Sequence, residues 1–150
     1  MFRSPRQVKK YRRPGRNLIA ANKIKPDQWN ISDAEVKEAL KVKGYDVKQV
    51  KKISCLKHQV CISYWDAKGN VCCSFFSYRI FARWQTDVEK LISCCPTFKE
   101  WKKLSHIMQY EFAYYHYLRQ MEETLSTALE NRLCVLNATE QIAVFQVVEQ

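Results

Sequence analysis

The fold is decided by residues 59–78, QVCISYWDAKGNVCCSFFSY, which have the character of two β-strands joined by a tight turn. Both halves, 59–65 and 71–78, are rich in β-branched and aromatic side chains, which favour strands. Between them, Asp66 suits the first position of a turn, and Gly69 suits a left-handed backbone conformation. This stretch therefore predicts an antiparallel hairpin.

The flanking sequence extends the hairpin into a meander that lies between two helices. Residues 45–55 change from helical spacing to a period of two, which predicts a first strand. Upstream, Ser32 and Glu35 have the spacing of a capping box and predict a helix over 33–43. Downstream, apolar residues at helical spacing predict a helix over 78–94. We expect a three-stranded antiparallel meander in the middle of this segment.

A long helix is predicted after the meander. Thr97 and Glu100 form a second capping-box pattern, and no Pro or Gly follows Pro96. These features predict one helix over 98–130. The predicted fold class is therefore α+β, in the order helix, three-stranded antiparallel meander, helix and long C-terminal helix, preceded by a basic N-terminal arm.

The end of the chain is less strongly patterned. Residues 133–136 suit a short strand or an extended link, and residues 139–148 suit either a strand or a helix capped by Thr139, of which we favour the helix. The aromatic density within 101–129 has two interpretations. These side chains close the core, or they bind a second copy of the chain or another protein, since Tyr and Met are enriched in interfaces.

Length and composition indicate one folded domain. The 150 residues, 47% of them hydrophobic, are enough to bury a core without disulfides or a metal. We expect a flexible basic arm at 1–25 and a single α+β domain at 26–150, subdivided into a helix–meander–helix part (26–95) and a helical association segment (96–150). No apolar run or secretory signal stands out, so we expect an intracellular protein, cytoplasmic or, in a eukaryotic cell, nuclear, with no membrane partner.

The net charge of +10 is concentrated at the N-terminus. Residues 1–25 carry nine basic side chains and no acid, whereas residues 105–150 carry two bases against six acids. A block of uncompensated cations with many arginines is suited to phosphate groups, because it releases their condensed counterions. A solvated tail or a localisation signal is the alternative for the arm. The charge distribution favours a nucleic acid as the partner and leaves DNA and RNA equally open.

Candidate nucleic-acid contacts come from the arm, the first strand and the following helix. On a regular strand, Lys48 and Lys52 point to one side and Lys51 to the other. These lysines form a basic sheet face, or they protect an edge strand from pairing with another chain. The candidate set is Arg3, Arg6, Lys9, Lys10, Tyr11, Arg12, Arg13, Arg16, Lys23, Lys25, Lys48, Lys51, Lys52, Arg79 and Arg83.

Two other functions compete with a non-catalytic nucleic-acid-binding protein. One is a protein–protein adaptor or a virion component whose basic arm packages nucleic acid. The other is a magnesium-dependent nuclease, for which Asp46, Asp66 and Glu35 supply carboxylates and Lys68 supplies a cation. Turn chemistry already accounts for Asp66 and Lys68, and no Gly-rich phosphate loop or nucleophile motif is present, so the sequence favours a protein without catalytic residues.

The seven cysteines are best interpreted as reduced thiols in a chain without a secretory signal. A zinc site would have to combine Cys55, His58 and Cys61 with Cys72 or Cys73, but the paired Cys-x-x-Cys spacing of zinc sites is missing. Buried thiols acting as small apolar side chains are the simpler interpretation. We therefore expect no metal and no cofactor.

Overall fold

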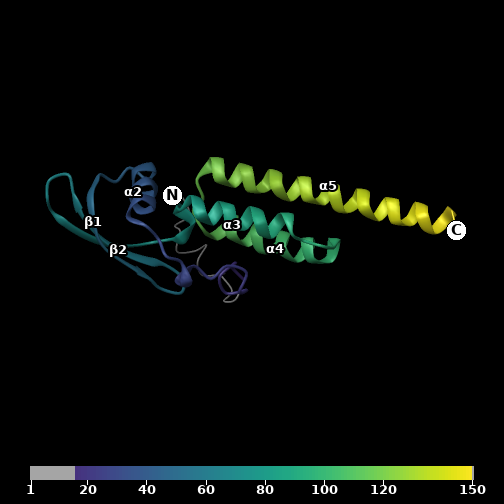
Figure 1. Ribbon diagram of the computed structural model, residues 1–150, viewed down its shortest axis with the longest axis horizontal. Coiled ribbons are helices and arrows are strands. Elements are labelled where there is room, and N and C mark those ends of the chain that lie inside the picture. The colour runs from purple at the N-terminus through teal and green to yellow at the C-terminus, as the bar shows by residue number, and fades with distance from the viewer. Residues whose placement is uncertain (1–15, 150) are drawn as a thin grey trace, which may run out of the picture. The chain divides into compact units, whose positions relative to one another are not determined.

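The computed structural model describes residues 16–149, with side chains through residue 141, and has an α+β fold (Figure 1). The predicted fold class and the order helix, meander, helix are confirmed. In chain order the elements are η1 (Pro26–Gln28), α2 (Asp33–Val42), β1 (Val47–Cys55), β2 (Val60–Asp66), β3 (Val71–Phe76), η2 (Tyr78–Ile80), α3 (Ala82–Ser93), α4 (Phe98–Tyr114) and α5 (Arg119–Glu149).

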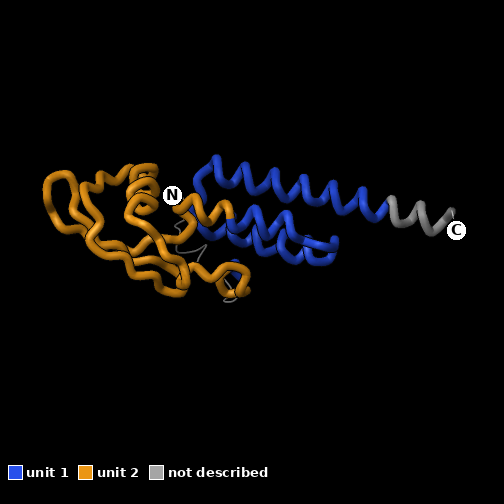
Figure 2. Tube along the Cα trace, viewed as in Figure 1, with its two compact units in different colours: residues 1–18, 87–150 blue, residues 19–86 orange. Residues whose placement is uncertain are grey.

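The chain forms two compact units (Figure 2). Residues 19–86 form the sheet unit, which contains α2 and the three strands, and the described residues before 19 and after 86 form the helical unit. The boundary lies within α3, whereas the sequence suggested a subdivision near residue 95. Among residues 16–149, no helix combines the length and the apolar character needed to cross a membrane.

Helix α2 begins and ends as its local sequence predicts. The Ser32 hydroxyl accepts a hydrogen bond from the Glu35 backbone N–H at 3.2 Å, and the Glu35 carboxylate accepts one from the Ser32 N–H, which completes the capping box. Gly44 ends the helix with a φ of 92°, a conformation that glycine adopts without strain. Val36 and Leu40 are fully buried, and α2 packs against β1.

The three strands form an antiparallel sheet in the order β1-β2-β3. The β2–β3 turn is the predicted one: Gly69 has a φ of 83°, and the Asp66 carboxylate accepts hydrogen bonds from the backbone N–H groups of Lys68 and Asn70, both at 2.9 Å. On β2, Ile62 and Tyr64 point to the same side and are buried. One face of the sheet therefore belongs to the core of the sheet unit.

An aromatic cluster follows the third strand. The predicted helix over 78–94 begins as the short η2 and continues as α3. Tyr78, Phe81 and Trp84 are almost fully buried, and each makes an edge-to-face contact with Trp29, with ring centroids 5.5 to 6.4 Å apart. The chain before α2 is thereby packed onto the segment that follows the meander.

The prediction of one helix over 98–130 is wrong, because α4 and α5 are separated by a break. Tyr115 has an extended backbone, with φ −121° and ψ 148°. Near the break, the buried carboxylate of Glu111 accepts hydrogen bonds from the Tyr117 hydroxyl at 2.5 Å and from the Leu18 N–H at 3.0 Å. The bond to Leu18 comes from a distant part of the sequence, and the bond to Tyr117 comes from just beyond the break. Together these hydrogen bonds stabilise the break between α4 and α5.

Helix α5 includes two segments for which the sequence allowed other structures. Residues 133–136 are helical rather than extended, and the helix over 139–148 is a continuation of α5. Thr139 is not an N-cap, because its hydroxyl donates to the Val135 carbonyl one turn earlier. α4 and α5 pack together, and the Trp101 indole N–H donates to the Leu129 carbonyl at 2.9 Å.

The packed structure begins before residue 26, where the sequence placed the end of the arm. Leu18 is fully buried, and Ile19 and Ile24 are only 4% and 5% exposed. Residues 16–25 therefore supply core side chains despite their positive charge. The rest of the predicted arm lies outside the described residues.

Candidate nucleic-acid interface

The face of the sheet opposite the buried one carries a mixture of aromatic, basic and thiol side chains. On β2, Trp65 lies on the side opposite Tyr64, and on β3, Phe75 lies on the side opposite Phe76. Phe75 is 59% exposed, an unusual state for so large an apolar side chain. We call this surface the open face; its members are Gln49, Lys51, Lys52, Ser54, Cys61, Ser63, Trp65, Val71, Cys73 and Phe75.

A β-bulge places two lysines on the open face. From Val50 to Lys52, β1 advances by two residues, while its partner advances by one, from Tyr64 to Ser63. Lys51 is the extra residue. The expectation that Lys51 and Lys52 point to opposite sides holds only for a regular strand, and here the bulge brings both to the same side.

One of the two lysines contacts an aromatic side chain of the face. The Lys51 Nζ atom is 5.7 Å from the centroid of the Trp65 ring, within the range of a cation–π contact. Lys52 stands opposite Ser63 in the strand register, and its charge acts on the neighbouring Cys61 thiol. Lys48 is also an extra residue of β1, at a second irregularity between Val47 and Gln49, and it is exposed.

Arg79, by contrast, lies inside the sheet unit. It is 2% exposed, and its guanidinium carbon is 4.7 Å from the centroid of the Trp84 ring. Its guanidinium also donates to the Ser77 hydroxyl at 3.2 Å. In this conformation Arg79 does not reach a phosphate in solvent, and we do not count it in the candidate surface.

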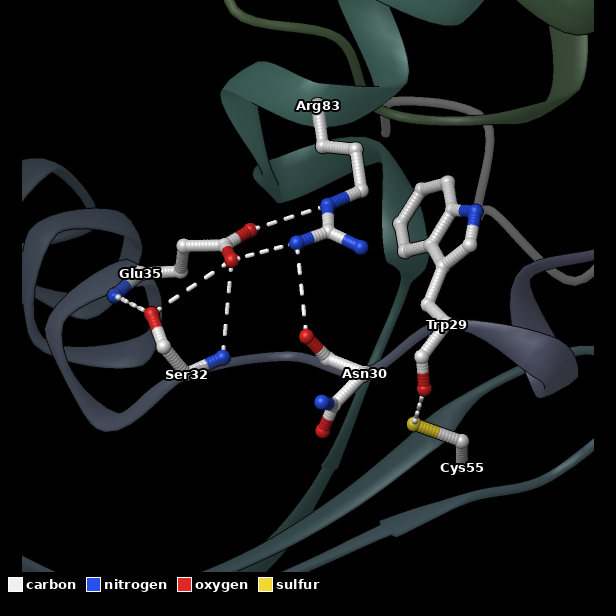
Figure 3. A network of polar contacts seen from close by, with 6 residues as sticks. All are labelled: Trp29, Asn30, Ser32, Glu35, Cys55 and Arg83. Carbon is white, nitrogen blue, oxygen red and sulfur yellow. Dashed lines mark hydrogen bonds and ion pairs between the residues drawn. The ribbon is translucent and has the colours of Figure 1, made fainter.

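Arg83 is engaged by an ion pair rather than lying on the open face (Figure 3). Its Nε and a terminal nitrogen donate to the two carboxylate oxygens of Glu35 at 3.1 and 2.5 Å, and the terminal nitrogen also contacts the Asn30 carbonyl. The guanidinium carbon is 5.4 Å from the Trp29 ring. This network joins the N-terminus of α2 to the start of α3, which gives Arg83 a structural role.

The remaining predicted contacts belong to the arm. Arg16, Lys23 and Lys25 are described and exposed. Most of the arm candidates lie outside the described residues: Arg3, Arg6, Lys9, Lys10, Tyr11, Arg12 and Arg13.

The candidate nuclease residues are used in other ways. The hydrogen bond from Asn70, together with that from Lys68, holds the pKa of the Asp66 carboxyl below its ordinary value, as expected for a turn carboxylate. Glu35 is paired with Arg83, and Asp46 is exposed immediately before β1. Within the part of the chain that the structure describes, no three His, Cys, Asp or Glu side chains are placed to hold a metal ion.

Two of the considered zinc ligands, Cys55 and Cys61, lie on opposite sides of the sheet. Cys55 stands opposite Val60 on the buried side of the sheet and donates to the Trp29 carbonyl at 3.9 Å. Cys61 is one position further along β2 from Val60 and therefore lies on the open face. The two thiols point away from one another across the sheet.

Two residues of the open face, Trp65 and Phe75, were not among the predicted contacts. The sequence does carry a signal for them, because β3 is apolar at both alternating sets of positions, including Val71 and Phe75 on one side and Phe76 on the other. When a strand is apolar on both sides, either both faces of the sheet are covered by other parts of the protein or one apolar face is exposed to solvent. Which of the two applies depends on packing that the sequence pattern does not show.

Comparison with models of protein families, with curated proteins and with solved structures found no match to this chain. The open face therefore has to be interpreted from its own chemistry.

Proposed function

We propose that this protein is a small non-catalytic nucleic-acid-binding protein that holds a single strand on the open face, with the basic arm adding phosphate contacts. The observation that carries the proposal is the presence of two lysines, Lys51 and Lys52, on the same side of one sheet as Trp65 and Phe75. Aromatic rings stack on unpaired bases, and lysines neutralise the adjacent phosphates, with little dependence on base sequence.

The preference for a single strand follows from the same chemistry. Bases in a duplex are stacked on one another and are not available to aromatic side chains. Trp65 pairs with Val71 beside the β2–β3 turn, and Phe75 on β3 pairs with Cys61 on β2. Because Cys61 and Trp65 are four residues apart on β2, the two aromatic residues are four positions apart along the strand direction. At about 3.3 Å per residue this is roughly 13 Å. The chemistry does not distinguish DNA from RNA, so both belong in the test.

The test compares two phenylalanine variants in a fluorescence anisotropy assay at low salt, with labelled single-stranded DNA, single-stranded RNA and duplex DNA. Phe75→Ala should weaken single-strand binding about 5- to 150-fold, which corresponds to roughly 1–3 kcal/mol for one lost stacking contact. Phe98→Ala is the matched control, because Phe98 is 41% exposed but belongs to α4.

Three outcomes would overturn the proposal. Equal affinities of the two variants would show that the open face does not bind the strand. Absence of binding to every nucleic acid at low salt would favour the adaptor function, with a protein partner for the arm or for residues 101–129. Tighter binding of the duplex than of the single strands would contradict the stacking argument.

A further inference from the structure

Two thiols meet on the open face. In the register of β2 and β3, Cys61 stands opposite Phe75 and Cys73 stands opposite Ser63, so the cysteines are diagonal neighbours on one side of the sheet. Their sulfur atoms are 3.6 Å apart and share a hydrogen bond. Cys73 is exposed and Cys61 is half-buried, so a small solute reaches the pair from solvent.

The two thiols differ in acidity. Hydrogen bonds from Ser63 and from Cys61 lower the pKa of Cys73, while the hydrogen bond with Cys73 raises the pKa of Cys61. Cys73 is therefore the first of the two to become a thiolate, the form that reacts with oxidants. Lys52 opposes the rise at Cys61 by a Coulombic effect.

The other cysteines with described partners are engaged elsewhere. Cys72 points to the opposite side of β3 and donates to the Asp66 carboxylate at 3.9 Å, and Cys55 donates to a backbone carbonyl. Cys95 is buried and donates to the Leu91 carbonyl. Cys94 and Cys134 are exposed in the helical unit and serve as controls for simple accessibility.

We propose that Cys61 and Cys73 form a reversible oxidation site on the open face, which closes to an intrachain disulfide on reaction with a peroxide. The Cys73 thiolate attacks one peroxide oxygen, the O–O bond breaks, and water leaves after protonation, so that Cys73 carries a sulfenic acid. The Cys61 sulfur then attacks the Cys73 sulfur, the S–O bond breaks, and the departing hydroxide takes the Cys61 proton as water. Two thiols lose two electrons in total, and one hydrogen peroxide becomes two waters.

The geometry needs only a small adjustment. A disulfide bond is about 2.0 Å long, so the sulfurs must approach by roughly 1.6 Å. Because diagonal neighbours on adjacent strands are roughly 7–8 Å apart, this approach takes side-chain rotation together with a small shift of the two strands. The product would link β2 to β3 in the middle of the open face, between Trp65 and Phe75. The reaction itself does not depend on nucleic-acid binding, so the proposed function can fail while this site stands.

The site is tested by mapping disulfides in the full-length protein. The reduced chain is treated with hydrogen peroxide, remaining thiols are alkylated, and trypsin is added under non-reducing conditions. Cleavage after Lys57, Lys68 and Arg79 places Cys61 in the peptide 58–68 and Cys73 in the peptide 69–79. The expected product is a cross-link between these two peptides in monomeric protein, and it should disappear on addition of dithiothreitol.

Cysteine variants show which two sulfur atoms form the disulfide. Cys73→Ser and Cys61→Ser should each abolish the cross-link, whereas Cys72→Ser, with a cysteine removed from the same peptide, should retain it. Absence of the cross-link in the wild-type chain, its persistence in Cys73→Ser, or its occurrence only between two chains would overturn the proposal. Fragmentation of the wild-type cross-linked peptide between Cys72 and Cys73 gives the same assignment without any variant.

Discussion

Lys51 and Trp65 lie in cation–π contact, with the Lys51 Nζ atom 5.7 Å from the ring centroid, and the contact exists because β1 carries a bulge. Without the extra residue, strict alternation would place one of two consecutive lysines on each side of the sheet. With it, both Lys51 and Lys52 share the side that exposes Phe75. An irregular strand thus creates the combination of charge and aromatic surface on which the proposed function rests.

Neutralising the two bulge lysines should reduce the salt dependence of binding. For single strands, each lost phosphate contact lowers the slope of log K against log salt by about 0.7 in magnitude. The double variant Lys51→Gln/Lys52→Gln should therefore lose about 1.4 from the slope, measured by anisotropy between roughly 50 and 200 mM salt. Lys37→Gln/Lys41→Gln on α2, which removes the same charge from exposed positions, is the control. A slope equal to that of the control would remove the two lysines from the interface.

Two N-terminal deletions should separate binding from folding. Removing residues 1–15 takes away six cations, so affinity should fall and the salt slope should decrease by up to about 4. Removing residues 1–25 also removes the buried Leu18, Ile19 and Ile24. The longer deletion should cost several kcal/mol of unfolding free energy, since truncating one such side chain typically costs about 2–5 kcal/mol.

The two deletions are compared by thermal melting followed by circular dichroism and by anisotropy. A longer deletion that melts at the same temperature as the shorter one would show that residues 16–25 contribute nothing to the core. An unchanged affinity of the shorter deletion would remove the arm from the binding mechanism.

The buried carboxylate at the break between α4 and α5 should be important for stability. Glu111→Ala leaves the Leu18 N–H and the Tyr117 O–H without this acceptor inside the helical unit. A buried donor without an acceptor costs about 1–3 kcal/mol, so we expect a loss of roughly 2–5 kcal/mol in a urea titration. Glu130→Ala, at an exposed position of α5, should change the unfolding free energy by less than about 0.5 kcal/mol. Equal effects of the two variants would contradict the role given to Glu111.

Asp66 distinguishes the turn function from the nuclease alternative. Asp66→Ala should lower the melting temperature at neutral pH, because two turn amides lose their acceptor, and it should not alter any magnesium-dependent cleavage of nucleic acid. The pKa of Asp66 is lowered in the folded state, so its stabilising effect is present above the ordinary value of 3.8 and is lost as the pH falls through the folded-state pKa. The melting temperatures of the two proteins should therefore converge at acidic pH.

The control for this comparison is Asp46→Ala, which removes a carboxylate that the nuclease alternative also requires. Magnesium-dependent cleavage that is present in the wild-type chain and lost in both variants would establish the nuclease. A melting difference for Asp66→Ala that persists unchanged into acid would show that its stabilising effect does not come from the ionised carboxylate.

The sequence by itself determined the elements whose causes lie within a few residues. Ser32 and Glu35 are three positions apart and start α2, and Asp66 and Gly69 are three positions apart and close the hairpin. Such contacts do not depend on how the rest of the chain packs. The chain between the partners is short, so the entropy lost in bringing them together is small. The α+β class and the strand order followed from these local signals.

The tertiary structure alone decided which side chains serve the core and which remain at the surface. Leu18 donates to Glu111 across 93 positions of sequence, and Arg83 pairs with Glu35 across 48. The same kind of packing buries Arg79 on Trp84 and leaves Phe75 exposed. The sequence pattern shows whether a side chain is apolar or charged. Whether that side chain is buried depends on which distant segment packs against it, and this is fixed only in the folded chain.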